Sequence, residues 1–335
     1  MKHIHRTILF ALVPAACLSA VQAHAQSTQS AQSTYSDYPS KPVTIVVPTE
    51  GTGIGEDVRV FIQSIERTYP GTSYLIERRA GAASTIGTAF VAKSRPDGYT
   101  LLAPNTAFTI APAVYSDLTY DVTRDCSPIS LLMQKAYLLV VHNSLPCKNV
   151  KEYLSYTRFN PDELNFATSG AGSSTHLPGA LLHHMTKTKV TFIHYKKSSE
   201  RVSDTLGGRT GALVGTYATL VTHFKSGRLR PLGVTTTKRI SSAPDLPTIA
   251  ETVPGFEYSS WTGMLAPAKT APELVTKMNR IWTESLKDPM VAKKLEADGT
   301  IIVASSPQDF QKFINADSAK WKSLIKATGI KVGDD

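Results

Sequence analysis

The 335-residue chain carries 36 Lys and Arg against 27 Asp and Glu, a formal net charge of +9, and 8% of its residues are aromatic. Its basic residues never form a run longer than two, which favours a solvated surface that attracts anionic ligands over nucleic-acid binding. This length favours two domains over one.

The N-terminus has the pattern of an export signal. Basic residues precede an apolar run, Ile8–Val21, which is shorter than the roughly 20 residues needed to span a membrane. Residues 23–25 (Ala-His-Ala) match a cleavage site. We expect residues 1–25 to be a signal peptide cleaved near Ala25 and residues 26–37, rich in Ser, Thr, Gln and Ala, to be a disordered leader.

A strand, a turn and a helix follow. Val43–Val47 is rich in β-branched residues, and Asp57–Thr68 has apolar side chains at helical spacing. The turn between them contains Thr49, Thr52 and Gly53. Because a helix N-terminus presents unpaired N–H groups and a partial positive charge, these residues are predicted to contact an anion.

The next elements complete a βαβαβ pattern. We predict a strand at Ser73–Glu77, a helix at Ser84–Lys93 capped by its first residue, and a strand at Tyr99–Ala103. This alternation predicts a mostly parallel sheet that binds ligands beyond the carboxyl ends of its strands. Asn105 and Thr106, just past the last strand, are therefore candidate ligand contacts.

Two cysteines remain after export. The apolar runs Pro128–Met133 and Tyr137–His142 fit an antiparallel pair about a turn near 136–137, which would place Cys126 opposite Cys147. A disulfide closing a loop of this size would stabilise the protein by roughly 3 kcal/mol. The alternative is a pair of buried free thiols.

The alternation of strands and helices restarts near residue 164 and predicts a second domain. Its strands are expected at Leu164–Thr168, Val190–His194, Ala212–Thr216 and Leu229–Thr235, and its helices at Leu177–Thr186, Glu200–Leu206 and Ala218–Ser226. The first strand leads into a second Gly/Ser/Thr turn, so we expect both halves to hold one ligand. The candidate contacts of this half are Ser169, Gly170, Ala171, Ser173, Ser174, His176, Lys196 and Thr216.

The tail is predicted to form three helices that pack on the first sheet. They are expected at Pro272–Lys287, Pro289–Ala297 and Pro307–Thr328, the last capped by Ser305 or Ser306.

Several motifs follow one another at characteristic spacings. They are residues 96–101 (PDGYTL), 164–168 (LNFAT) with the Ser/Gly loop and His176, 195–196 (YK), 227–232 (GRLRPL) and 245–251 (DLPTIAE). Together they resemble the Bug, or TctC-like, extracytoplasmic solute-binding proteins of tripartite tricarboxylate transporters. The resemblance covers essentially the whole mature chain.

This resemblance implies an α/β fold: a two-domain periplasmic-binding-protein clamshell (type II, Venus-flytrap) with doubly wound sheets and crossing hinge strands. Domain I would comprise residues 38–138 plus 236–335, and domain II residues 139–235, with hinges near Tyr137–Val141 and Leu232–Thr235. It also implies a monomeric periplasmic protein without cofactor or catalysis. Such a protein captures a small organic carboxylate and delivers it to integral-membrane permease subunits.

The chain departs from the family pattern at positions that bear on the ligand. Glu50 in the first turn would repel a carboxylate held close to it. Gly215-Thr216 stands where the family often has Asp-Asn, which removes a partner for an ammonium group and favours a mono- or dicarboxylate, aliphatic or aromatic, over an amino acid. Lys196, Lys197 and Arg201 offer a cation for a second carboxylate, with a solvated basic rim as the alternative. Ser260-Trp261 would add a wall.

Other function classes are less favoured. No Gly-x-Ser-x-Gly elbow of a hydrolase occurs, and His176, His183 and His184 lack the spacing and the acidic partner of a metal site. His176 is better interpreted as a loop organiser or ligand donor. A ligand sensor that docks on a membrane receptor would use the same fold, so this role remains open beside transport.

Overall fold

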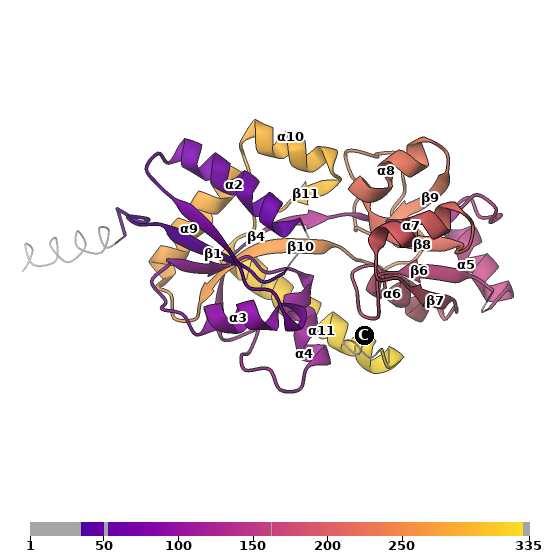
Figure 1. Ribbon diagram of the computed structural model, residues 1–335, viewed down its shortest axis with the longest axis horizontal. Coiled ribbons are helices and arrows are strands. Elements are labelled where there is room, and N and C mark those ends of the chain that lie inside the picture. Colours follow the sequence, from indigo (N-terminus) through magenta and orange to yellow (C-terminus); the bar gives the residue numbers. More distant parts are fainter. Residues whose placement is uncertain (1–34, 50–52, 162, 331–335) are drawn as a thin grey trace, which may run out of the picture. The chain divides into compact units, whose positions relative to one another are not determined.

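Two mixed β-sheets with covering helices make up the described chain (Figure 1). The computed structural model describes residues 35–49, 53–161 and 163–330. Residues 41–335 form one compact unit, separate from residues 1–40, and everything below concerns the larger unit. The predicted signal peptide, Glu50, Thr52 and most of the predicted leader lie outside the described residues.

The first sheet has the strand order β11-β4-β10-β3-β1-β2. Its strands are β1 (Val43–Val47), β2 (Tyr74–Arg78), β3 (Thr100–Leu102), β4 (Cys126–Lys135), β10 (Ser260–Pro267) and β11 (Thr300–Ile302). β1 is parallel to both β2 and β3, whereas β10 and β11 are antiparallel to β4. Four of the five β1 residues are buried, as expected for a parallel strand covered on both faces.

The helices associated with this sheet come from both ends of the chain. They are α2 (Ile54–Thr68), α3 (Thr85–Ala92), α4 (Thr106–Val114), α9 (Pro272–Ser285), α10 (Pro289–Ala297) and α11 (Pro307–Thr328). Helices α9 and α11 contact β4, which confirms that the tail packs back on the first sheet. Ser306 caps α11 by accepting a hydrogen bond from the Asp309 N–H.

The second sheet has the strand order β7-β6-β8-β5-β9. Its strands are β5 (Tyr137–His142), β6 (Asn165–Thr168), β7 (Thr191–His194), β8 (Ala212–Thr216) and β9 (Leu229–Val234). Its helices are α5 (Val150–Phe159), α6 (Leu177–Thr186), α7 (Ser198–Leu206) and α8 (Tyr217–Lys225). β6 is parallel to β7 and β8, and β5 is antiparallel to β8 and β9.

The predicted hairpin and disulfide are wrong. β4 pairs with β10 and β11, whereas β5 pairs with β8 and β9 in the other sheet. The chain passes from one sheet to the other at Ala136, so the two apolar runs continue onward instead of folding back. Cys126 and Cys147 are therefore free and buried in separate hydrophobic clusters.

The α/β class with two sheets joined by crossing segments is confirmed. The first sheet takes its strands from residues 43–135 and 260–302, and the second from residues 137–234. The predicted domain boundaries and hinges follow this division but remain predictions.

Four helix starts differ from expectation: α7 begins at Ser198 instead of Glu200, α8 at Tyr217 instead of Ala218, and α2 and α3 differ as follows. α2 begins at Ile54, three residues before the predicted Asp57, because Gly53 adopts a left-handed φ of 74° that starts the helix directly after the turn. Ser84 precedes α3 but does not cap it. Its φ of 77° is left-handed, and its buried hydroxyl has no hydrogen-bond partner among the described residues.

Candidate functional site

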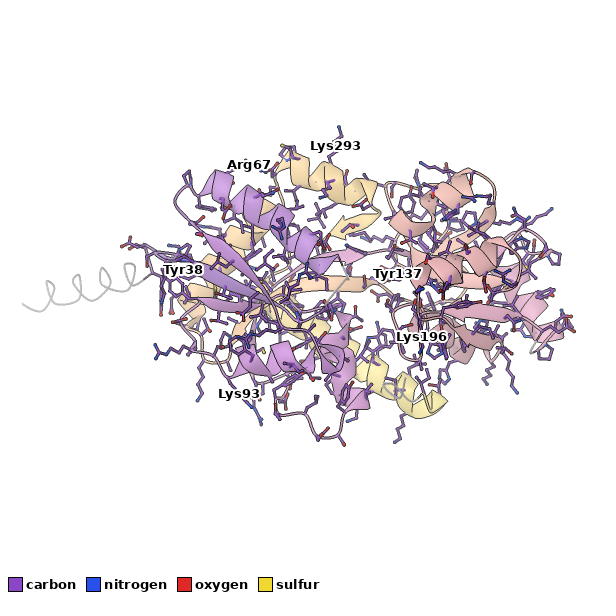
Figure 2. All side chains as sticks on the ribbon, in the orientation of Figure 1. Tyr38, Arg67, Lys93, Tyr137, Lys196 and Lys293 are labelled. Atoms are coloured by element: carbon purple, nitrogen blue, oxygen red, sulfur yellow. The ribbon has the colours of Figure 1, made fainter. Side chains whose placement is uncertain are left out.

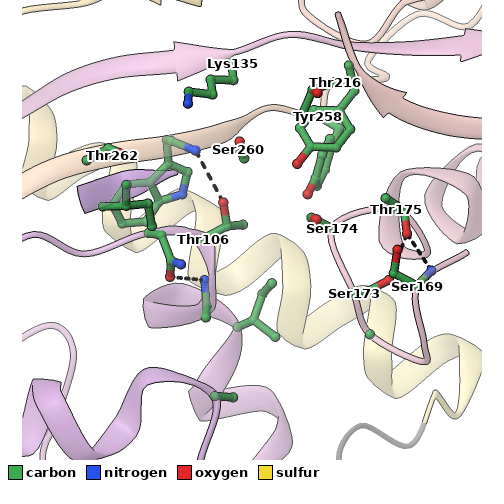
Figure 3. Close-up of a pocket in the computed structure, with 18 of the residues that line it drawn as sticks. Thr106, Lys135, Ser169, Ser173, Ser174, Thr175, Thr216, Tyr258, Ser260 and Thr262 are labelled. Atoms are coloured by element: carbon green, nitrogen blue, oxygen red, sulfur yellow. Dashed lines mark hydrogen bonds between the residues drawn. The ribbon is translucent and has the colours of Figure 1, made fainter. Parts of the chain in front are cut away.

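A cavity of about 570 Å³ lies between the two sheets and is lined by both (Figure 3). From the first sheet it receives Lys135 at the end of β4 and Ser260 at the start of β10. From the second it receives Ser169 directly after β6 and Thr216 at the end of β8. The cavity has the size of a small-molecule site and lies where an α/β sheet presents loops to ligand.

The loop after β6, residues 169–176, is shaped by its own hydrogen bonds. The Ser169 N–H donates to Thr175 Oγ1 at 2.8 Å, and the Ser173 and Thr175 hydroxyls are 3.1 Å apart. Ser173 Oγ also accepts from the His176 N–H at 3.2 Å, and Ser173 O accepts from the Leu177 N–H at 2.9 Å. Ser173 thus caps the helical turn before α6. Helix α6 itself begins after His176, which makes no side-chain capping bond.

His176 holds the loop from behind. Its Nδ1 accepts a hydrogen bond from the Gly172 N–H at 2.9 Å, and its ring packs edge-on against Phe192 with 4.4 Å between centroids. Burial lowers the pKa of His176 to about 4, so the imidazole is neutral at physiological pH. The side chain is buried and does not line the cavity, which supports its interpretation as a loop organiser.

The facing wall is built by the start of α4. Asn105 caps this helix by accepting a hydrogen bond from the Ala107 N–H at 3.0 Å, and Thr106 is its first residue (Figure 3). Thr106 Oγ1 accepts from the Trp261 N–H at 3.4 Å, which ties the helix to β10. No acid lies in the first turn of α4, so its positive end faces the cavity without compensation from its own sequence.

Lys135 and Asp57 form an ion pair in the same wall. Lys135 Nζ lies 2.6 Å from Asp57 Oδ2, and both side chains are largely shielded from solvent. Burial raises the pKa of Asp57 despite the opposing effect of Lys135. This cation of the cavity is therefore neutralised within the protein.

Arg201 is the corresponding cation of the second-sheet wall, and it has no acidic partner among the described residues. Its side chain is only 2% exposed. Nη1 donates to the Val214 carbonyl at 2.8 Å, whereas Nε makes no hydrogen bond. Burial lowers the pKa of Arg201 to about 10, which leaves the guanidinium charged at neutral pH.

Two tyrosines next to the points where the chain crosses between the sheets also line the cavity. Tyr137 and Tyr258 pack edge-to-face with 5.2 Å between ring centroids. The buried Tyr258 hydroxyl points toward Ser174 in Figure 3. Burial raises the Tyr258 pKa well above its ordinary value, so the hydroxyl remains a proton donor.

The structure brings together about half of the predicted contacts. Lining the cavity are Asn105, Thr106, Ser169, Ser173, Ser174 and Thr216, together with Ser260, Trp261 and Arg201. Thr49, Gly53, Gly170, Ala171, His176 and Lys196 do not line it. Lys196 is exposed (Figure 2), and Lys197 pairs with Glu200 at the surface.

Sequence reasoning missed several lining residues. They include Ile54, Asp57, Lys135, Tyr137, Ser198, Thr219, Tyr258 and Thr262. Lys135 and Tyr137 flank the point where the chain crosses between sheets, and Tyr258 precedes the returning strand β10. These three residues could have been predicted from their position next to the crossing segments, because the segments that connect two domains line the cleft between them.

In residues 35–49, 53–161 and 163–330 there is no group of three or more His, Cys, Asp or Glu side chains able to hold a metal ion. In the same part of the chain no helix is both long and apolar enough to cross a membrane.

Fold and cavity together define a solute-binding protein of the periplasmic-binding-protein clamshell class. Residues 59–330 match the family model described as "Tripartite tricarboxylate transporter family receptor" (TctC). The chain belongs to this family, which consists of binding proteins rather than enzymes.

Individual relatives support this assignment. A UPF0065 protein of Bordetella bronchiseptica is 32% identical, with 99% of this chain and 95% of the relative covered. The structure of R. palustris Rpa4515 with adipate is 33% identical and has a TM-score of 0.73, covering 88% of this chain and 99% of that one. The periplasmic binding protein BugD is 29% identical, with a TM-score of 0.70 and the same coverage.

Proposed function

We propose that this protein captures a small organic carboxylate between its two sheets, in the periplasm and as a monomer. It then delivers the solute to the membrane permease subunits of a tripartite tricarboxylate-type transporter. The observation that carries the proposal is the convergence of the Ser169–Thr175 loop and the start of α4 on one cavity. Hydroxyl and backbone N–H groups of this kind bind carboxylates.

Each wall contributes donors to the solute in this proposal. Ser173 and Ser174 face it from the second sheet, and Thr106 from the first. A carboxylate that contacts both walls stabilises the closed arrangement, because those contacts are lost when the walls separate. The family membership and the relative solved with adipate support a carboxylate as the solute.

A thermal-shift screen tests the solute class. The panel contains succinate, adipate, citrate, benzoate and terephthalate, with glutamate as an amino-acid contrast. A ligand at 100 times its Kd stabilises the folded state by about 2.7 kcal/mol, a readily measured rise in Tm. We expect at least one carboxylate to raise Tm. Silence across the panel, repeated after unfolding and refolding to remove bound solute, would refute the carboxylate assignment.

A double substitution tests the loop. Ser173→Ala with Ser174→Ala should lower the affinity for the best carboxylate by roughly 10-fold or more, since two hydroxyl donors are lost. The matched control is Ser94→Ala with Ser226→Ala, whose hydroxyls bond carbonyls of their own helical turns outside the cavity. In cells lacking the gene, uptake of that carboxylate should be restored by the wild type but not by the loop variant.

A further inference from the structure

Arg201 is a buried cation whose hydrogen-bonding capacity is largely unused. It lines the cavity from the first turn of α7. Nη1 donates to one backbone carbonyl, Nη2 reaches Ser198 Oγ only at 3.5 Å, and Nε has no partner in the part of the chain that the structure describes. A guanidinium has five N–H donors suited to binding a carboxylate through two parallel hydrogen bonds.

Among the described residues, the charge of Arg201 is also uncompensated. Three charged residues of this part of the chain line the cavity, and two of them, Asp57 and Lys135, neutralise each other. The acid in the first turn of α7, Glu200, is exposed and pairs with Lys197. The positive ends of α7 and α8 reach the cavity through Ser198 and Thr216, so helix dipoles add to the charge of Arg201.

Gly215 leaves space beside the guanidinium. A Cβ atom at this position would lie 3.6 Å from Arg201 Nη2, and a longer acidic side chain there would reach the cation. With glycine, no side chain at this position of β8 can supply the missing charge. A buried cation without a counter-ion destabilises a protein unless something outside the chain supplies one.

We propose that Arg201 binds a second anionic group of the solute, separate from the carboxylate held between the Ser169–Thr175 loop and α4. The site therefore selects small dianions, such as dicarboxylates, over monoanions of the same length. This inference rests on the proposed function and adds the identity of the charged anchor. It also disfavours amino acids that would present an ammonium group to Arg201.

Calorimetry with matched solutes tests the proposal. Adipate is compared with its half-amide, and terephthalate with its half-amide, so that each pair differs by one negative charge at nearly constant shape. The wild type should bind the diacid roughly 10- to 100-fold more tightly than the half-amide. Arg201→Gln should remove this preference while leaving the affinity for the half-amide nearly unchanged.

A charge control and a stability measurement complete the calorimetric test of Arg201. Lys197→Gln removes one positive charge from the same end of α7 but lies outside the cavity, and it should keep the preference for the diacid. Without ligand, Arg201→Gln should be at least as stable as the wild type, because an uncompensated buried charge is gone. A merely structural role for Arg201 predicts the opposite result.

The outcomes separate the two proposals. Equal loss of diacid and half-amide binding in Arg201→Gln, or no loss at all, would overturn the role of Arg201. Binding of monocarboxylates with no preference for diacids in the wild type would do the same while leaving the proposed function intact. If no carboxylate binds the wild type, both proposals are wrong.

Discussion

The two walls of the cavity treat a buried cation in opposite ways. In the first-sheet wall, Lys135 lies 2.6 Å from Asp57, so its charge is neutralised by another side chain of the protein. In the second-sheet wall, the partners of Arg201 within the described chain are neutral, a carbonyl and a distant hydroxyl. Since an unpaired buried charge is costly to folding, its presence beside a cavity is better explained by binding than by stability.

The walls also differ in what keeps their shape. The first is tied together by backbone and ion-pair contacts among α2, α4, β4 and β10. The second depends on neutral histidines: His176 supports the loop, and His183 bonds Tyr153 at 3.0 Å and Thr188 at 2.7 Å. Charge on either imidazole would place a cation in a poorly hydrated site, so we expect the second wall to be the more sensitive to acid.

Of the changes considered, acidification should have the largest effect on the free energy of unfolding. Burial lowers the folded-state pKa of His176 and of His183 to about 4, below the ordinary value of 6.5. The stability contributed by each neutral imidazole is present above about pH 6.5 and is lost as the pH falls toward 4, by up to about 3 kcal/mol per histidine. Asp57 acts in the other direction, because a carboxyl with a raised pKa loses stability as the pH rises through that value.

Urea unfolding at pH 7 and pH 4.5 measures this loss. His183→Gln should show a smaller drop between the two pH values than the wild type. The neighbouring His184→Gln, at an exposed position, serves as the control and should follow the wild type. An unchanged drop in His183→Gln would show that the acid sensitivity lies elsewhere.

Gly215→Asp should make the second wall resemble the first. An Asp side chain beside Arg201 Nη2 supplies the missing counter-ion from within the protein. The affinity for dicarboxylates should fall roughly 100-fold, equivalent to about 2.7 kcal/mol, because the solute must displace an internal carboxylate and is repelled by it. Without ligand the variant should be more stable than the wild type.

Gly215→Ala separates charge from volume. A Cβ atom at this position would lie 3.0 Å from Leu220 Cδ1, the end of a flexible side chain, so a small shift accommodates either substitution. Calorimetry and thermal melting of the two variants should therefore differ, with Ala close to the wild type. If Ala and Asp weaken binding equally, crowding and not charge is responsible.

Asp57→Asn should make the first wall resemble the second. The substitution leaves Lys135 partly buried without its partner, so its charge is no longer neutralised within the protein. The affinity for dicarboxylates should rise severalfold, because a second cation becomes available to the solute. Glu56→Gln is the control, since Glu56 is exposed and lies 3.4 Å from Arg78. Weaker binding by Asp57→Asn would contradict this view of the ion pair.

Much of the fold was accessible from local patterns. β1, β5, β8, α6, α10 and α11 begin and end where periodicity and capping residues placed them. Helices α4 and α5 and strands β10 and β11 were not predicted. α4 carries Pro112 within it, and β10 is recognisable only from its pairing with β4, which is distant in sequence.

In the site, too, the residues within one local motif could be predicted, whereas those fixed by tertiary packing could not. Hydroxyl residues of the Ser169–Thr175 loop were found because a strand, a glycine-rich turn and a helix are adjacent in sequence. Lys196 was predicted as a ligand contact, and Lys197 and Arg201 were left open, because local sequence does not show which side chain is buried. In the structure Arg201 is buried, lines the cavity and points back toward β8, whereas Lys196 and Lys197 are exposed.

The cysteines provide the smallest expected effect, which is none. A disulfide requires the two Cα atoms to lie within about 7 Å of each other. Cys126 belongs to the core cluster of the first sheet and Cys147 to that of the second, and both are free. Burial raises the pKa of Cys126 to about 12, which keeps its thiol protonated and unreactive in the folded protein. Reductant should therefore leave Tm unchanged, and alkylation after unfolding without reductant should modify both thiols, as measured by intact mass. If both cysteines stay unmodified, or if reductant lowers Tm, a disulfide joins Cys126 and Cys147 and this prediction is wrong.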